Sequence, residues 1–202
     1  MAEQYFEHDP RSESRPRPIE VEYGGERFGF VTDAGVFSGG GLDDGTRLLL
    51  DAALPLLHGR VLDLGCGWGP VGVIAGKLCP ACSITMLDVN ARACALAEAN
   101  AKSMGVRAEV VCADSPLAAP GPFDWILLNP PIRAGKQAVY ALFRESRDSL
   151  APGGKLAVVI RRQQGAESAR DYLGTLFAQV TPAKRKKGYH VYICEGDSGD
   201  IR

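Results

Sequence analysis

Three closely spaced glycines in this 202-residue chain are placed to hold a ligand. Gly65, Gly67 and Gly69 lie in the segment VLDLGCGWGPVG at 61–72, directly between a predicted strand and a predicted helix. Glycine lets the backbone turn tightly and approach a bound molecule, as it does in nucleotide-binding loops. The spacing is G-x-G-x-G, not the G-x-G-x-x-G of dinucleotide-binding loops. A plain strand–helix connection has similar glycines, so other residues must decide between the two interpretations.

Acidic residues accompany the predicted strands around this loop. Asp63 precedes the loop inside its strand, Asp88 ends the next strand, and Asp114 follows the third. An acid placed like Asp88 can accept hydrogen bonds from both hydroxyls of a ribose, and Asp114 is placed to accept from an adenine amino group. Each acid alone is also typical of a turn or a helix cap. Three acids around one glycine loop favour a ligand site, because open α/β sheets bind ligands at the carboxyl ends of their strands.

The loop and its acids resemble the class I S-adenosylmethionine-dependent methyltransferases. D-L-G-C-G-W-G is similar to the cofactor loop of that family, Asp88 to its ribose acid, and Asp114 to its adenine-side acid. The resemblance covers approximately residues 35–195 and implies a Rossmann-like, seven-stranded sheet with one antiparallel edge strand. It also implies that S-adenosylmethionine is the cofactor and that the following residues bind it: Asp63, Gly65, Cys66, Gly67, Gly69, Asp88, Val89, Asn90, Ala113, Asp114 and Asn129.

The segment Asn129-Pro130-Pro131 closes a fourth apolar strand and supplies the predicted catalytic residues. Two prolines fix the backbone and remove two N–H donors, so their carbonyls are expected to be unopposed acceptors. The side-chain oxygen of Asn129 beside such a carbonyl makes an acceptor pair, which can bind both hydrogens of an amino group and turn the nitrogen lone pair toward a methyl donor. Positioning and electrostatics then supply most of the rate. A rigid turn after a strand is the alternative interpretation.

N-P-P followed by an aromatic residue is the signature of the amino-methylating branch of this family, which includes DNA adenine, rRNA guanine-N2 and protein-glutamine methyltransferases. This sequence has Ile132 where those enzymes usually carry Phe or Tyr, which argues against stacking of a flipped base at this position and leaves an apolar lid as the alternative. G-V-F-S at 35–38, L-D-D-G-T-R-L-L-L at 42–50 and N-P-P-I-R-A-G-K at 129–136 look most like the small-domain rRNA guanine-N2 methyltransferases. This resemblance implies methyl transfer to the exocyclic N2 of a guanine in ribosomal or other structured RNA.

Basic residues give modest independent support for an RNA substrate. Arg133, Lys136 and Arg161 are placed to meet phosphates near the target, and with Ile132 they are the predicted substrate contacts. The run Lys184–Lys187 is expected to be a loop at the edge of the sheet opposite the cofactor, and so to be solvated surface.

Two other functions stay open on the sequence alone. Methylation of a protein glutamine amide would use the same acceptor pair and would not require basic residues near the site. A cofactor-binding module that has lost catalysis is the second alternative, and the intact Asn129-Pro130-Pro131 argues against it.

The elements that must position these residues alternate between strands and helices, which predicts an α/β fold with a mostly parallel sheet and helices on both faces. Residues 1–18 are predicted to be a flexible arm, 19–34 a β-hairpin around Gly24-Gly25, and 35–195 the catalytic core of a single domain over 19–202. The expected strands of the sheet are 60–64, 83–88, 107–112, 123–128, 155–160, 179–183 and 189–194. The expected helices are 46–57, 71–78, 91–104, 136–149 and 166–177, and a tight turn is expected at Pro152-Gly153-Gly154.

Composition sets further bounds. Hydrophobic residues make up 46% of the chain, enough for one sizeable core, and the formal net charge of −1 gives no overall attraction to nucleic acid or to an anionic membrane. No apolar run approaches the ~20 residues that span a bilayer, and the polar N-terminal segment is unlike a signal or transit peptide. The sequence therefore predicts a cytoplasmic protein without a membrane partner, and it leaves the oligomeric state open.

Cysteine usage predicts neither a metal site nor a redox site. Cys79 and Cys82 form a C-P-A-C pair, but no second pair completes four zinc ligands. The other four cysteines lie singly in apolar or glycine-rich surroundings, where a free thiol behaves as a small hydrophobe. These are Cys66, Cys94, Cys112 and Cys194.

Overall fold

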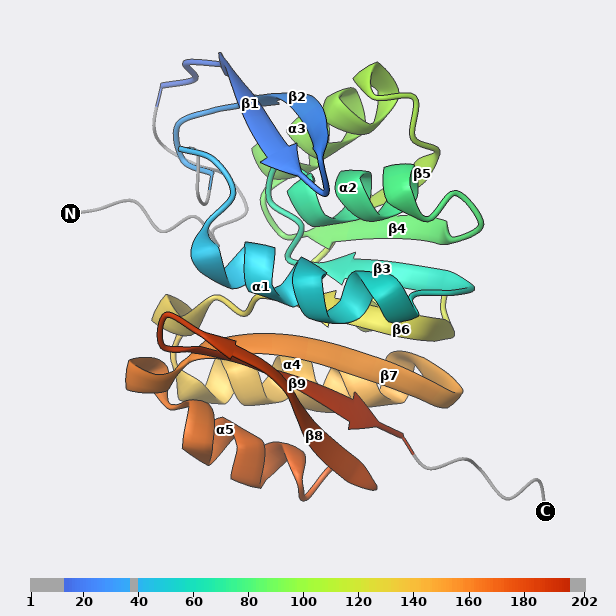
Figure 1. The fold of residues 1–202 in the computed structure, drawn as a ribbon, viewed down its shortest axis with the longest axis vertical. Helices are drawn as coiled ribbons and strands as arrows, with labels where there is room; N and C mark the ends of the chain where they lie inside the picture. The colour runs from blue at the N-terminus through green and yellow to red at the C-terminus, as the bar shows by residue number, and fades with distance from the viewer. Residues whose placement is uncertain (1–12, 37–39, 197–202) are drawn as a thin grey trace.

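The computed structural model describes residues 13–36 and 40–196, and it confirms the predicted α/β fold. Seven strands form one sheet in the order β5-β4-β3-β6-β7-β9-β8, with helices on both faces (Figure 1). The strands are β3 (Arg60–Leu64), β4 (Ser83–Asp88), β5 (Ala108–Cys112), β6 (Phe123–Leu128), β7 (Leu150–Arg161), β8 (Gln179–Lys186) and β9 (Tyr189–Glu195). The helices are α1 (Asp44–Ala53), α2 (Pro70–Leu78), α3 (Ala91–Ser103), α4 (Lys136–Ser149) and α5 (Ala166–Leu173).

Side chains of the central strands alternate between two apolar layers. In β6, Trp125 and Leu127 pack into the layer that contains α1, α2 and α3, whereas Ile126 and Leu128 pack into the layer that contains α4 and α5. This alternation follows from the two-residue period of a strand. Because both faces of β6 are buried, its sequence is an almost continuous run of apolar residues. The polar residues that end these strands are therefore left at one edge of the sheet.

The position of the antiparallel strand differs from the expectation. Within the described sheet, β9 alone runs antiparallel to its neighbours, and it pairs with β7 on one side and β8 on the other. The antiparallel strand is thus the second strand from the edge of the sheet, and β8 is the edge strand. Strand β8 consequently runs in the same direction as β7.

The predicted N-terminal hairpin is confirmed and consists of β1 (Arg17–Tyr23) and β2 (Glu26–Thr32). Gly24 and Gly25 form its turn at φ values of +60° and +81°, which glycine adopts without strain. Asn100 of α3 exchanges two hydrogen bonds with the backbone of Val31, at 2.8 and 2.9 Å, and donates a third to the carbonyl of Trp68 at 2.8 Å. The hairpin is therefore tied to the glycine loop through one amide side chain.

The predicted arm is shorter than expected at its C-terminal end. Strand β1 begins at Arg17, two residues before the predicted strand, and residues 1–12 lie outside the described part of the chain. Just before the strand, Ser14 Oγ and the Arg15 N–H each donate to the carboxylate of Asp33, at 2.6 and 2.5 Å. These contacts fix the chain against the end of β2.

Three predicted boundaries are wrong for local reasons. Helix α1 ends at Ala53, and a 3-10 turn over Leu54–Leu56 (η1) follows because Pro55 cannot continue the α-helical hydrogen bonds. The tight turn predicted at 152–154 lies inside β7, where the register with β6 shifts. Helix α5 ends before Gly174, and the residues up to Phe177 continue as turns.

The predicted loop at 184–187 is largely strand. Strand β8 continues to Lys186, and only Lys187-Gly188 form the turn into β9. Lys186 pairs with Tyr189, and Tyr189 pairs with Arg161 at the carboxyl end of β7. The expectation that this run lies opposite the cofactor edge is therefore wrong, because the turn lies at the edge where the parallel strands end, which we call the carboxyl edge.

Within the part of the chain that the structure describes, no helix is long and apolar enough to cross a membrane.

Candidate functional site

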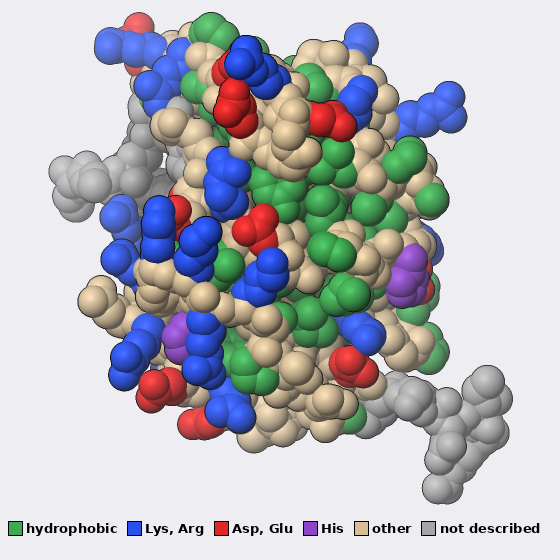
Figure 2. Space-filling model, viewed as in Figure 1, with side chains coloured by type: hydrophobic (Ala, Val, Ile, Leu, Met, Phe, Trp, Pro, Cys, Tyr) green, Lys and Arg blue, Asp and Glu red, His purple; other side chains and the backbone are tan. Residues whose placement is uncertain are grey.

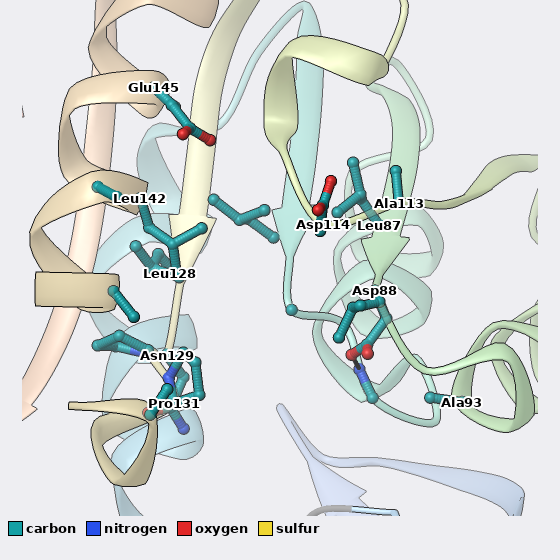
Figure 3. A pocket seen from close by; sticks show the side chains of 18 of the residues that line it. Leu87, Asp88, Ala93, Ala113, Asp114, Leu128, Asn129, Pro131, Leu142 and Glu145 are labelled. Atoms are coloured by element: carbon teal, nitrogen blue, oxygen red, sulfur yellow. Dashed lines mark hydrogen bonds between the residues drawn. The ribbon is translucent and has the colours of Figure 1, made fainter. Parts of the chain in front are cut away.

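A cavity of about 320 Å³ opens at the carboxyl edge and has two walls (Figure 3). One wall follows β3, β4 and β5 and contains Leu64, Gly65, Gly67, Leu87, Asp88, Val89, Ala93, Ala113 and Asp114. The other follows β6 and α4 and contains Leu128, Asn129, Pro130, Pro131, Ala134, Ala138, Ala141, Leu142 and Glu145. Val36, from the segment after the hairpin, also lines the cavity.

The glycine loop presents bare backbone to this cavity. Gly65 and Gly67 have φ values of +73° and +56°, and a Cβ atom on either residue would meet nothing within 4 Å. They therefore leave open space against which a ligand can lie close to the backbone. Gly69 differs, since a Cβ there would lie 3.1 Å from Ala97 and 3.2 Å from Met86. The first two glycines thus leave room for a ligand, whereas the third allows α2 to pack against α3.

Asp88 is held in place by the loop that it faces. Its Oδ2 accepts a hydrogen bond from the Gly67 N–H at 2.8 Å, and its Oδ1 accepts from the Asn90 N–H at 2.9 Å. Each oxygen keeps acceptor capacity for a ribose hydroxyl. Burial raises the pKa of Asp88, and the backbone donors act against that shift. Asp114 stands on the same wall and is exposed (Figure 3).

Asp63 lies deeper, under the glycine loop. It is buried, and its Oδ2 accepts from the Gly72 N–H at 2.8 Å. Burial raises the pKa of Asp63 to about 7, and the charge of Asp88 adds to the shift. Asp63 and Cys66 border a second cavity of about 40 Å³, which shares Gly65, Gly67 and Asn129 with the first. A buried acid at this junction is suited to a cation such as the ammonium group of S-adenosylmethionine.

The amide of Asn129 is oriented by a chain of hydrogen bonds from α1. Its Nδ2 donates to Thr46 Oγ1 at 3.0 Å, and the Thr46 hydroxyl donates to Asp43 Oδ2 at 2.5 Å. Because the single hydroxyl hydrogen of Thr46 is used on Asp43, Thr46 can only accept from Asn129. Asp43 is fixed in turn as the N-cap of α1, with Oδ1 accepting from the Gly45 and Thr46 N–H groups. The amide oxygen of Asn129 is left available to the site.

The two proline carbonyls are not unopposed, contrary to the expectation. Pro130 O accepts from the Ile132 N–H at 2.9 Å, and Pro131 O accepts from the Ala134 N–H at 2.8 Å. The second of these bonds begins the short 3-10 turn at Ile132–Ala134 (η3) that follows the strand. A carbonyl oxygen has two lone pairs, so Pro130 O retains capacity for one further donor beside Asn129.

The predicted substrate residues do not gather in the main cavity. Ile132 and Lys136 line a separate cavity of about 230 Å³ between α4 and α5, where Lys136 Nζ lies 5.1 Å from the centre of the Tyr140 ring. Arg133 is exposed on η3. Arg161 is exposed at the end of β7, with its guanidinium 5.6 Å from the centre of the Tyr189 ring.

Most of the predicted cofactor residues border a cavity, with two exceptions. Gly69 and Asn90 are outside the residues that line either cavity. Asn90 is buried and caps α3, since its Oδ1 accepts from the Arg92 and Ala93 N–H groups. Its Nδ2 donates to Gly35 O at 3.2 Å, which holds the segment before Val36 beside the cavity. Asn90 therefore shapes the site from behind.

Sequence reasoning missed one face of α4. Ala138, Ala141, Leu142 and Glu145 all line the main cavity, and Glu145 stands on the wall opposite Asp114 (Figure 3). Their spacing of three, four and seven residues is that of a single helical face, and this was the available signal. Thr46 was also missed, because its contact with Asn129 joins residues 83 positions apart.

The six cysteines are all free, and Cys66, Cys94 and Cys194 are buried. Cys112 is exposed, which corrects the expectation of an apolar environment. Burial raises the pKa of the Cys66 thiol well above its usual value. Among the described residues, no group of three or more His, Cys, Asp or Glu side chains is arranged to hold a metal ion.

Comparison with known proteins assigns the fold to a family. The family model of the methyltransferase small domain matches residues 27–193. The chain is 38% identical over 195 residues to the uncharacterized protein YbxB of Bacillus subtilis, and the match covers 95% of this chain and 97% of that protein. It is 40% identical over 133 residues to the ribosomal RNA small subunit methyltransferase C of Pseudomonas entomophila, covering 64% of this chain and 40% of that enzyme.

A solved structure with the same fold holds ligands. The 16S rRNA N2 G1207 methyltransferase of T. Thermophilus, in complex with AdoMet and guanosine, matches with a TM-score of 0.81 at 22% sequence identity. That match covers 91% of this chain and 51% of the other. The chain thus spans about half the length of the T. Thermophilus enzyme and less than half the length of the Pseudomonas entomophila enzyme.

Replacing Asp88 by Ala should weaken the binding of S-adenosylmethionine roughly ten- to a hundredfold, because a charge-assisted hydrogen bond contributes about 1.5–3 kcal/mol. Titration calorimetry measures the affinity, and circular dichroism checks that the fold persists. Glu98→Ala, which removes an exposed acid on α3, is the matched control and should bind like the wild type. Equal affinity in Asp88→Ala and the control would show that Asp88 only fixes the loop.

Asp63 should make the protein less stable as pH rises from about 4 to 7. In that range the unfolded chain, in which the pKa is near 3.8, releases the Asp63 proton, whereas the folded protein, with a pKa of about 7, retains it. The free energy of unfolding therefore falls as pH rises through this window. Asp63→Asn keeps an acceptor for the Gly72 N–H and should flatten the fall, as measured by denaturant titrations at several pH values. The same slope in both proteins would show that the pKa of Asp63 is not raised.

Proposed function

The chain belongs to the methyltransferase small-domain family, and from this premise we propose that it methylates the exocyclic N2 of a guanine in structured, ribosomal RNA. It is an S-adenosylmethionine-dependent methyltransferase. The proposal concerns the acceptor: which atom receives the methyl group, and on what kind of molecule.

The orientation of the Asn129 amide carries the proposal. Because Nδ2 donates to Thr46, the amide oxygen is the acceptor that Asn129 offers to the cavity, beside the remaining lone pair of Pro130 O. An amino group has two hydrogens to donate, and this acceptor pair can bind both. Binding both hydrogens fixes the plane of the amino group, so that the nitrogen lone pair, which is perpendicular to that plane, can face the cofactor wall.

Bound S-adenosylmethionine supplies an electrophilic methyl group on its sulfonium. The residues of this chain then have to position the amino group and support the positive charge that develops on nitrogen. Methylation of carbon would instead call for a nucleophile such as a cysteine thiolate. Cys66 is unsuited to that role, because it is buried and its pKa is raised.

Two further observations support RNA as the substrate. Relatives that share 35–41% identity with parts of this chain are named ribosomal RNA small subunit methyltransferases. Arg133 and Lys136 are exposed cations on the segment that follows β6, close along the chain to Asn129, and Arg161 is an exposed cation at the carboxyl end of β7. These positions suit contacts with phosphates.

The acceptor pair would also fit the amide of a protein glutamine, so the test must separate the two substrates. The protein is incubated with methyl-labelled S-adenosylmethionine and with separated RNA and protein fractions, and the labelled RNA is digested to nucleosides for mass analysis. We expect label in RNA, as N2-methylguanosine. Label in protein alone would support the glutamine alternative, and no label in either fraction would support a module without catalysis.

Asn129→Ala should slow the chemical step by about 10²–10³, because it removes one polar contact at the reacting centre, and it should affect cofactor affinity less than this step. Asn129→Asp should retain more activity than Asn129→Ala, since a carboxylate still accepts from the amino group and supports positive charge on nitrogen. Single-turnover rates with a 16S rRNA transcript measure both variants. A normal rate in Asn129→Ala, or a product methylated on carbon or oxygen, contradicts the amino-group assignment.

Thr46→Val should slow turnover about five- to tenfold, because it removes the acceptor that orients Asn129, and one hydrogen bond contributes about 1 kcal/mol. Thr46→Ser keeps the hydroxyl and should restore the rate, which a purely structural role for the Thr46 methyl group would not allow. The rate constants and the S-adenosylmethionine affinity are measured for both variants. Identical rates in Val and Ser variants would remove Thr46 as a positioning residue.

A further inference from the structure

Four consecutive cations form the end of β8 and its turn into β9. We call Lys184, Arg185, Lys186 and Lys187 the basic tip, and all four side chains are exposed. The pairing of Lys186 with Tyr189, and of Tyr189 with Arg161, places the basic tip at the carboxyl edge (Figure 1). Figure 2 shows Lys and Arg side chains gathered where β8 turns into β9 and near the start of α1.

The basic tip is held against the helix that orients Asn129. Lys187 Nζ contacts both carboxylate oxygens of Asp44, at 2.9 and 3.2 Å. The ring of Tyr189 packs so closely on Gly45 that a Cβ there would lie 2.9 Å from it. The residue that follows is Thr46, which binds Asn129. The first turn of α1 therefore links the basic tip to the candidate catalytic amide.

The turn of the basic tip contains a lysine in a backbone conformation that residues other than glycine rarely adopt. Lys187 has a φ of +49° and is the one non-glycine residue with positive φ among those the structure describes. Turns of this kind favour Asn or Gly at that position, because a Cβ crowds the backbone there. A cation is thus kept at the tip in spite of backbone strain, which points to a use for it.

Positive charge at the basic tip is largely uncompensated. In residues 13–36 and 40–196, carboxylates lie within 4 Å of Lys187 (Asp44) and of the adjacent Arg162 (Glu167), but not of Lys184, Arg185 or Lys186. The other end of the same strand, 179–183, carries no charged side chain. The whole chain has a formal net charge of −1, so the positive charge of the basic tip is a local feature.

We propose that the basic tip is a phosphate-binding surface that holds the RNA backbone beside the catalytic cavity. This inference rests on the RNA substrate proposed above. Three strand spacings of about 4.8 Å separate β6 from β8, so the tip lies about 14 Å along the edge from β6, the strand that Asn129 follows. Contacts at that distance reach phosphates near the target nucleotide, and they position the RNA without reading its sequence.

The test removes two charges from the tip and measures the salt dependence of RNA binding. Lys184→Ala/Lys186→Ala is compared with the wild type on a 16S rRNA transcript over a series of salt concentrations. Each lost phosphate contact should reduce the slope of log affinity against log salt by about 0.7–0.9. We therefore expect a slope reduced by about 1.4–1.8, with unchanged affinity for S-adenosylmethionine.

The control removes the same charge from the opposite edge. Lys102→Ala/Arg107→Ala alters exposed cations at the end of α3 and just before β5, and should leave the wild-type slope in place. An unchanged slope in the tip variant, or an equal reduction in both variants, overturns the proposed surface. Failure of the wild type to bind the transcript overturns it as well.

The same samples separate this inference from the proposed function. A wild type that methylates the transcript, together with an unaltered slope in the tip variant, overturns the surface alone and leaves the guanine assignment standing. A slope that depends on the tip, with methyl label found only in the protein fraction, supports the surface and overturns the guanine assignment.

Discussion

Asn129 lies at the end of β6, yet its amide is oriented from α1. Nδ2 donates to Thr46, whose hydroxyl is committed to Asp43, and Asp43 caps the helix that Thr46 begins. An amide has an acceptor at one end and donors at the other, so its orientation decides whether the site accepts or donates hydrogen bonds. With the opposite orientation, Nδ2 would face the hydrogens of a target amino group and repel them. The helix cap and the chemistry of the site are therefore one connected arrangement.

The charge of the cavity walls favours one class of ligand over another. Asp63, Asp88, Asp114 and Glu145 border the two cavities, and among the described residues none of the four forms an ion pair. Such walls repel the phosphates of a dinucleotide and favour a cofactor with a sulfonium and an ammonium group. The G-x-G-x-G loop is consistent with this, because its glycines leave space beside Asp88 and create no phosphate cradle lined by cations.

How much the sequence could predict depended on how local each determinant is. The strand–helix alternation, the hairpin turn at Gly24-Gly25 and the acids after β4 and β5 follow from short-range patterns, and the structure contains them. The Thr46–Asn129 contact joins distant positions, and only tertiary packing reveals it. The prediction that the antiparallel strand lies at the edge was wrong for a similar reason, because the order of strands in a sheet is not encoded in any one segment. Gly69 and Asn90 belong to the predicted cofactor motifs; neither lines a cavity, Gly69 makes a close packing contact, and Asn90 caps α3.

The register of β8 with β9 places the cations of residues 184–187 at the carboxyl edge, apart from the carboxylates that border the cavities. Asp63, Asp88 and Asp114 border the cavities on the side of β3, β4 and β5, and Glu145 faces them from α4, whereas the cations of residues 184–187 lie toward β8. For the RNA substrate proposed above, the two regions act on different parts of one nucleotide chain. Phosphates are attracted to the cations and repelled by the acidic walls, whereas a neutral base can enter between those walls. The target base must therefore leave its stack while its backbone stays at the edge, which is the geometry that enzymes acting on a base require.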